Sequence, residues 1–256
     1  MENQNNSNKN IFTAVLAMAA AFAVFIAVFF ALKNIVIMNP VSDKSAYEIA
    51  VEDAVFAEKD EIETLVSITK DSPMVTWNED GTKVLVLSWH KYPESYPDGS
   101  SFVCEYGEVW TFTDKEILSW YQANNEGVTD WNLRLKQVIG LPEDKEYTHF
   151  TAFWADPDEL IRPAYQTDIT MQLSESDLDG SGLGEYEEWF DGNTLWSYFD
   201  SAYPWTRLGY TYDWADDGVD YGLTEFIILP DSTVEVEWTV STEEFISMLE
   251  SGSLQK

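Results

Sequence analysis

The sequence predicts an α+β fold: a single extracytoplasmic domain with an antiparallel sheet and several helices, preceded by one N-terminal transmembrane helix. Residues 11–32 form an unbroken apolar run, IFTAVLAMAAAFAVFIAVFFAL. Beyond residue 73, segments with strand-like alternation interleave with amphipathic segments in no regular strand–helix repeat. Hydrophobic residues make up 45% of the 256 residues, with 11 Trp, 13 Tyr and 14 Phe. That is too much apolar material for a disordered acidic chain.

The apolar run at residues 11–32 is long enough to cross a bilayer. At about 1.5 Å per residue it reaches roughly 33 Å, against a hydrocarbon core of about 30 Å. A cleaved signal peptide is the alternative, but its apolar core is usually about 7–15 residues long and ends at small residues. This run ends in Phe29-Phe30-Ala31-Leu32. We therefore expect an uncleaved anchor that follows a short cytoplasmic tail, residues 1–10.

The charge of the chain predicts where the rest of it lies. It carries 14 basic and 46 acidic residues, a net charge of −32, and all but one of the acidic residues lie in residues 41–256. A large domain behind a short tail and a signal-like segment is normally translocated, so we expect a single-pass protein of the cell inner (cytoplasmic) membrane with its C-terminal domain outside the cytoplasm. Such a surface repels phosphates, which argues against nucleic acid as a partner. The expected partners are the lipid bilayer, through residues 11–32, and a membrane protein.

Residues 33–72 are expected to form a juxtamembrane linker and an acidic amphipathic helix. Asn39-Pro40 ends the membrane helix, and apolar residues then recur at helical intervals between residues 46 and 68. This helix is either a stalk or a first helix packed on the domain. Residues 73–256 are expected to form the acidic α+β domain, which is large enough to bury a core of its own.

Within residues 73–256 the order of elements follows from turn and capping signals. Asp80-Gly81 predicts a hairpin between strands at 74–78 and 83–90, because the Asp-Gly pair readily adopts positive φ. Ser/Thr and Glu three residues apart predict capped helices that start after Thr113 and after Ser241, and Gly140 closes a helix over 129–139. Further strands are predicted at 108–113, 149–155, 224–229 and 233–240.

Residues 177–188, DLDGSGLGEYEE, match the spacing of a twelve-residue Ca²⁺ loop. Ca²⁺ binds six to eight oxygens, and such a loop supplies them at positions 1, 3, 5, 7, 9 and 12. Gly182 falls where the loop turns sharply, while the serine at position 5 departs from the usual Asp or Asn. The predicted metal ligands are Asp177, Asp179, Ser181, the Leu183 carbonyl, Glu185 (directly or through water) and Glu188.

The flanks of this loop differ from those of an EF-hand. Ile169, Met171 and Leu173 alternate as in a strand, whereas an EF-hand has a helix on each side. A second loop is also missing from the sequence. We expect an isolated, structural Ca²⁺ loop that continues into a helix from about residue 185 to 190, and the alternative is an acidic turn without metal.

Cysteine and histidine offer little chemistry. Cys104 is the only cysteine and the chain has two histidines, which excludes an intramolecular disulfide and a multi-thiolate metal site. We expect Cys104 to be a small buried hydrophobe. A Cys104–His90 nucleophile pair is the alternative, and no local signature supports it.

Aromatic residues and carboxylates are dense near the C-terminal end of the chain. Such a combination can line a sugar-binding cleft or supply the acid/base pair of a glycosidase. The candidates are Asp213, Asp216, Asp217 and Glu225, which lie near Trp205, Tyr210, Tyr212 and Trp214.

Two functions are therefore open. The first is a membrane-anchored extracytoplasmic binding or assembly module, such as an accessory subunit of a membrane complex, without turnover. The second is an envelope glycan hydrolase, which requires a deep cleft where two carboxylates converge, one of them with a raised pKa.

The segment PWTRLGYTYDW at residues 204–214, followed by residues 222–226, resembles segments of uncharacterised exported or membrane-anchored bacterial proteins. Residues 134–142 and Arg162-Pro163 add to the resemblance, which implies an exported bacterial setting and no particular activity. Arg162 and Arg207 stand among many carboxylates. We expect them to form buried or half-buried ion pairs, with the clamping of an anion or substrate as the alternative.

Overall fold

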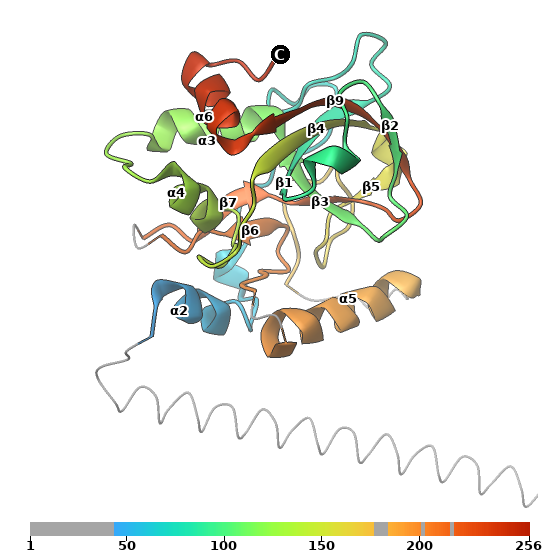
Figure 1. Cartoon of the computed structure of the whole chain (residues 1–256). Coiled ribbons are helices and arrows are strands. Elements are labelled where there is room, and N and C mark those ends of the chain that lie inside the picture. The colour runs from blue at the N-terminus through green and yellow to red at the C-terminus, as the bar shows by residue number, and fades with distance from the viewer. Residues whose placement is uncertain (1–43, 177–183, 201–202, 216–217) are drawn as a thin grey trace, which may run out of the picture. The chain divides into compact units, whose positions relative to one another are not determined.

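The computed structural model describes residues 44–176, 184–200, 203–215 and 218–256, with the side chains of residues 199 and 200 left out. A compact unit runs from Ser45 to Lys256. The predicted membrane span lies outside the described residues, and no helix within them is long and apolar enough to cross a membrane. The predicted α+β class with an antiparallel sheet is confirmed (Figure 1).

The main sheet has seven strands in the order β2-β9-β4-β1-β3-β8-β5, and every neighbouring pair is antiparallel. Two further strands, β6 and β7, pair separately. The strands are β1 Val84–His90, β2 Ser101–Val103, β3 Val109–Thr113, β4 His149–Ala155, β5 Leu160–Ile161, β6 Tyr210–Tyr212, β7 Tyr221–Thr224, β8 Phe226–Ile228 and β9 Thr233–Ser241.

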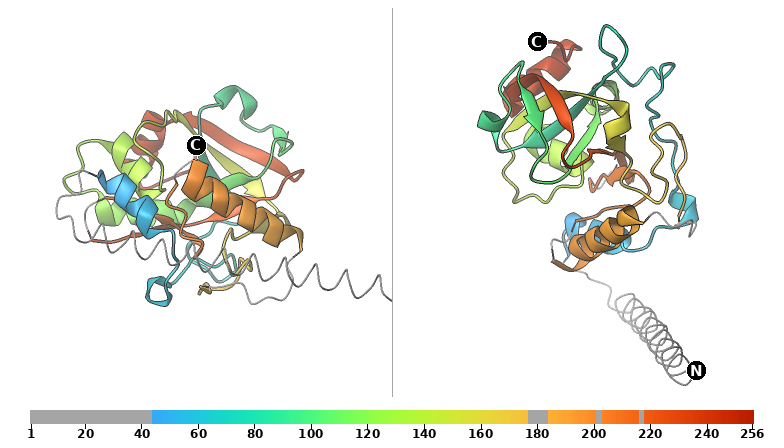
Figure 2. Two further views of the ribbon diagram at one scale, coloured as in Figure 1. Left: turned by 90° about the horizontal axis from the view of Figure 1, so that it is seen from below. Right: turned by 90° about the vertical axis from the view of Figure 1, so that its right-hand side faces the viewer.

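Five α-helices are present in the described part of the chain. Helices α3 and α6 contact one another and the sheet, whereas α2 and α5 lie at the end of the unit opposite α6 (Figures 1 and 2). The helices are α2 Ala46–Asp53, α3 Asp114–Asn124, α4 Trp131–Val138, α5 Glu185–Leu195 and α6 Thr242–Ser251. A π-helix, Trp196–Asp200, follows α5 directly.

The middle of the sheet is buried on both faces. All seven residues of β1 are buried, with Leu85 and Leu87 in the core under the helices and Val86 in the core on the other face. In β9 the buried residues alternate in sequence, yet they belong to both cores. A bulge opposite Ala152 and Phe153 explains this. Because the bulge adds one residue to β9, the alternating residues point to one face of the sheet before it and to the other face after it.

The predicted helix over residues 46–68 is too long. Helix α2 ends at Asp53, and residues 62–68 run extended beside residues 169–172. The backbone N–H of Leu65 donates to the carbonyl of Gln172 at 2.8 Å, and that of Ile68 to Ile169 at 2.8 Å. Residues 169–173 form no strand. Ile169 is buried, whereas Met171 and Leu173 are exposed, so the alternation does not mark one buried face. Residues 45–72 belong to the compact unit.

Of the two predicted capping boxes, the one at Ser241 is confirmed in its N-cap bond: the hydroxyl accepts from the Glu244 N–H at 3.2 Å. The box at Thr113 is wrong. Thr113 is the N-cap of α3 but makes no side-chain capping bond. Glu116 points into the protein instead, where its carboxylate accepts from the Thr224 N–H at 3.0 Å. This buried bond competes with the cap for the same side chain.

The strands predicted at 83–90, 108–113, 149–155 and 233–240 are confirmed within one residue, as is the turn at Gly81, whose φ is 70°. The strand predicted over 224–229 is divided. Thr224 belongs to β7 and residues 226–228 belong to β8. Glu225 lies between the two.

Candidate functional site

Glu225 is held at the point where the chain leaves the small sheet and enters the large one. Its backbone N–H donates to the carbonyl of Gly209 at 2.9 Å. Thr224 before it and Phe226 after it are fully buried, and the Phe226 carbonyl accepts from the Thr111 hydroxyl at 3.1 Å. Because the backbone is fixed on both sides, the direction in which the Glu225 side chain leaves the backbone is fixed as well.

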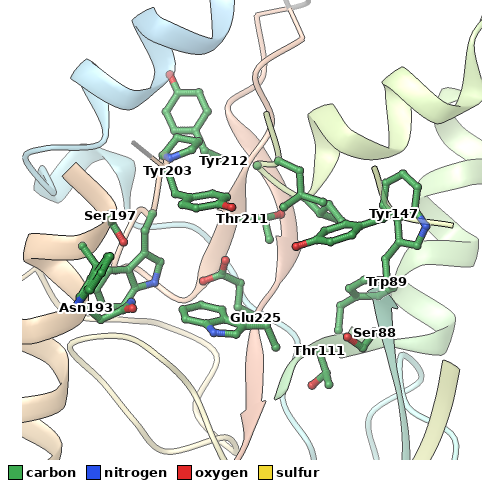
Figure 3. Close-up of a pocket in the computed structure, with 18 residues that line it drawn as sticks. Ser88, Trp89, Thr111, Tyr147, Asn193, Ser197, Tyr203, Thr211, Tyr212 and Glu225 are labelled. Carbon is green, nitrogen blue, oxygen red and sulfur yellow. The ribbon is translucent and has the colours of Figure 1, made fainter. Parts of the chain in front are cut away.

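The side chain of Glu225 lies in a cavity of about 440 Å³ (Figure 3). This size falls within the usual range for small-molecule sites, about 300–1,000 Å³. Most of the lining is apolar or aromatic and comes from segments far apart in the sequence. The lining residues are Ser88, Trp89, Trp110, Thr111, Phe112, Ile139, Gly140, Leu141, Tyr147, Asn193, Trp196, Ser197, Tyr203, Pro204, Trp205, Thr211, Tyr212 and Glu225.

Aromatic packing fixes the walls of this pocket. Trp89 stacks on Phe150 with ring centroids 5.1 Å apart and meets Tyr147 edge-on at 5.8 Å. Trp205 meets Trp110 edge-on at 6.0 Å. Trp89 and Trp205 are buried, whereas Trp196 is 62% exposed. The buried rings therefore belong to the interior of the pocket, and Trp196 gives it a solvent-facing side.

The Glu225 carboxyl group is buried, and one of its two oxygen atoms has no hydrogen-bond partner. The residue is 7% exposed, and neither its Oε2 atom nor the indole Nε1 of Trp205 has a hydrogen-bond partner. Burial raises the pKa of Glu225 to about 8, and the nearby Trp205 N–H opposes this rise. The group is mostly neutral at pH 7. Unpartnered buried polar atoms are rare in folded proteins and cost about 1–3 kcal/mol each, so both atoms suit a ligand's polar group.

The predicted cluster of carboxylates does not assemble around Glu225 within the described residues. Glu225 is the only carboxyl group among the described lining residues, which also include no Lys, Arg or His. The buried Asp213 carboxylate is bound instead by both terminal nitrogens of Arg134, at 2.9 and 2.8 Å. Asp216 and Asp217 lie outside the described residues. Of the aromatic candidates, Trp205 and Tyr212 line the pocket.

The ion pairs predicted for Arg162 and Arg207 are not formed in the described part of the chain. Both residues are buried, but their guanidinium groups donate to backbone carbonyls: Arg162 to Asp168 at 2.8 Å and Val66 at 2.9 Å, Arg207 to Val55 at 2.6 Å. Burial lowers the pKa of Arg162 to about 10. The two arginines fasten the segment before residue 72 to the rest of the unit.

The predicted Ca²⁺ loop falls largely outside the described residues. Helix α5 begins at Glu185, as predicted for the helix after the loop, and Glu185 and Glu188 are exposed on its first turn. No group of three or more His, Cys, Asp or Glu that could hold a metal ion occurs within the described ranges. The predicted ligands outside those ranges are Asp177, Asp179, Ser181 and Leu183.

The structure supports a structural role for Cys104. The residue is 1% exposed and packs in a core cluster, and burial raises the pKa of its thiol to about 11. His90 is engaged at both ring nitrogens: Nε2 lies 2.7 Å from the Thr151 hydroxyl, and Nδ1 accepts from the Tyr92 N–H at 3.0 Å. Neither Cys104 nor His90 lines the pocket.

Most of the pocket could not be predicted from local sequence. Trp89, Trp110 and Trp196 come from β1, β3 and the π-helix, and Tyr147 comes from the loop before β4. Only the high aromatic content hinted at them. Residues 204–214 and 134–142, noted above for a resemblance, both contribute lining residues.

Comparison with known proteins gives no relative. No protein-family model matches the chain, and neither a curated protein nor a solved structure matches it. The function must therefore be argued from the pocket itself.

Proposed function

We propose that residues 45–256 form a binding module that captures a small ligand in the aromatic pocket around Glu225. The observation that carries this proposal is the buried Glu225 carboxyl group inside the pocket, with its unpartnered Oε2 atom. A ligand that bonds to this group and to the Trp205 N–H recovers the free energy lost by burying them. The rigid aromatic walls keep the pocket formed in the absence of a ligand, which lowers the entropic cost of binding.

We also propose that the module acts outside the cytoplasm. Residues 11–32 would hold it in the cytoplasmic membrane, with the bilayer and a membrane protein as partners. The acidic composition and the apolar run support this placement. A structural Ca²⁺ ion bound by residues 177–188 belongs to the same proposal, on the evidence of the loop's spacing.

A glycan hydrolase is the second candidate, because a glycosidase general acid also has a raised pKa in an aromatic cleft. Hydrolysis of this kind uses a second carboxyl group about 5–10 Å away. No second carboxyl group is among the described lining residues. Binding without turnover is therefore the better supported function.

The test is a screen of the full-length protein against neutral glycans, amino acids and organic amines, read by tryptophan fluorescence and by the unfolding midpoint. Ser197 is buried and lines the pocket, so Ser197→Phe should fill it and abolish binding. Ser247→Phe, at an exposed position of α6, is the matched control and should bind normally.

Two results would count against binding in this pocket. One is that no class of compound shifts either signal, and the other is that Ser197→Phe binds as well as the wild type. Cleavage of a glycan, detected by mass spectrometry and lost in Glu225→Gln, would favour the hydrolase instead.

A further inference from the structure

We infer that the ligand of this pocket is an organic ammonium ion, an inference that rests on the binding function proposed above. The juxtaposition that points to it is a buried Glu225 carboxyl group, with an unpartnered Oε2 atom, among aromatic side chains. Figure 3 shows this carboxyl group pointing into the space between Tyr203 and Tyr147. An ammonium ion is attracted both to a carboxylate and to the electron-rich faces of aromatic rings.

The aromatic part of the site is suited to a cation. Four tryptophans and three tyrosines are among the described lining residues. At Tyr203 an ammonium already lies over the ring, since the Lys145 Nζ is 5.7 Å from its centroid. Cation–π contacts stabilise a bound cation more strongly in a desolvated site than at an exposed one.

The charges of the protein disfavour an anionic ligand. The described lining has no basic residue to pair with one, and the net charge of −32 repels anions and attracts cations. Residues 143–146, between the lining residues Leu141 and Tyr147, are exposed and comprise three acidic residues and Lys145. An approaching cation therefore meets a favourable field before it enters.

Glu225 couples this binding to a proton. Its carboxyl group is mostly protonated at neutral pH, because burial raises its pKa to about 8. A bound cation stabilises the carboxylate, so the O–H bond of the carboxyl group breaks and the proton passes to the solvent. In the balanced equilibrium, the free protein with protonated Glu225 binds one cation, and the products are the complex and one released proton.

Four described tyrosines near Glu225 stay uncharged between pH 6 and 9. Burial raises the pKa values of the tyrosines at positions 147, 186, 198 and 212 above their ordinary value of 10.0. Tyr203 is a further lining tyrosine, and the pKa of the neighbouring Lys145 is raised from 10.5 by its bond to Tyr203. The proton released on binding is therefore that of Glu225.

The experiment compares ammonium ions with uncharged molecules of the same shape. Choline is paired with 3,3-dimethylbutan-1-ol, and butylammonium with butan-1-ol. Each is titrated into the full-length protein in amine-free solution at constant ionic strength.

At pH 9 we expect at least one of the cations to bind about tenfold or more tightly than its uncharged partner. From pH 8 down to pH 6 its affinity should fall by about tenfold per pH unit, and a pH-stat should detect close to one proton released per ligand at pH 7.

Variants assign these effects to the pocket. Glu225→Gln should lose the proton release and the pH dependence and should bind the cation about tenfold or more weakly. Trp205→Phe keeps the carboxyl group and should retain the pH dependence. Unfolding midpoints check that both variants are folded, and the proton count on the wild type needs no variant.

The inference and the proposed function fail in different ways. If the uncharged molecules bind as tightly as the cations, or if only neutral glycans bind, the ligand is not an ammonium ion although the binding function stands. Binding of a cation without proton release and without dependence on Glu225 also overturns the inference. If no compound of any class binds, the proposed function itself is wrong.

Discussion

Glu225 affects stability as well as binding. Its pKa is about 8 in the folded protein, against an ordinary value of 4.5. Between these two values the unfolded chain releases the proton and the folded protein retains it. The stabilising contribution of the protonated group is complete below pH 4.5 and is lost as the pH rises to about 8.

Replacing Glu225 with glutamine should remove this pH dependence. The amide keeps the size of the side chain but does not ionise. On going from pH 5 to pH 8.5, the free energy of unfolding of Glu225→Gln should therefore rise by about 2–4 kcal/mol relative to that of the wild type. Urea unfolding at several pH values measures it. Glu235→Gln, which changes a surface acid paired with Lys83, is the control and should keep the wild-type slope. Identical slopes for all three proteins would show that Glu225 ionises normally in the folded state.

The buried pair of Arg134 and Asp213 stabilises the fold without entering the pocket. Removing one partner leaves the other charge buried, so Asp213→Ala should lower the free energy of unfolding by about 3–5 kcal/mol. The double variant Arg134→Met/Asp213→Leu should lose less free energy of unfolding than the sum of the losses in Arg134→Met and in Asp213→Leu. Lys83→Met, at the exposed pair, should cost about 0–1 kcal/mol. Additive losses in a urea double-mutant cycle would contradict the proposed coupling.

At the scale of the elements, the sequence predicted those whose signal is local. The alternation over β4 and β9, the Asp-Gly turn before β1 and the Ser241 cap of α6 depend on neighbouring residues, and these predictions were confirmed. The long helix after residue 46 was wrong because residues 62–68 make their backbone bonds to residues 169–172, which no local pattern records.

The pocket shows the same limit. Glu225 was among the candidate carboxylates, but its burial depends on β3, α5 and the segment at 203–205, which are distant in sequence. Asp213 seemed equivalent to it in sequence. The two differ because Arg134, on α4, forms a buried ion pair with Asp213, whereas no basic residue is among the described residues that line the pocket around Glu225.

The segment before α5 carries the prediction about Ca²⁺. At constant ionic strength, Ca²⁺ at about 100 times its dissociation constant should stabilise the protein by about 2.7 kcal/mol relative to chelator. Asp177→Ala/Glu188→Ala should abolish the resulting rise in the thermal midpoint, whereas Glu187→Ala, outside the ligand positions, should retain it. A midpoint that Ca²⁺ leaves unchanged would make residues 177–188 an acidic turn without metal.

At the scale of the whole molecule, the net charge of −32 has two effects. It attracts cations to the protein, and it destabilises the compact state by self-repulsion. Salt screens this repulsion, so raising NaCl from about 0.05 to 1 M should raise the urea midpoint. KCl should act equally, because screening does not depend on the identity of the cation. A midpoint that does not change with salt would show that the acidic groups lie too far apart to repel one another.

The ionisation of Glu225, a buried and mostly neutral carboxyl group in the pocket, can be observed directly. The most direct test is a ¹³C NMR titration of the glutamate carboxyl carbons, in which the signal missing from Glu225→Gln identifies Glu225. We predict that this signal titrates near pH 8 in the free protein and at a lower pH when choline or butylammonium is bound. Titration near the ordinary value of 4.5, unchanged by either cation, would contradict the account.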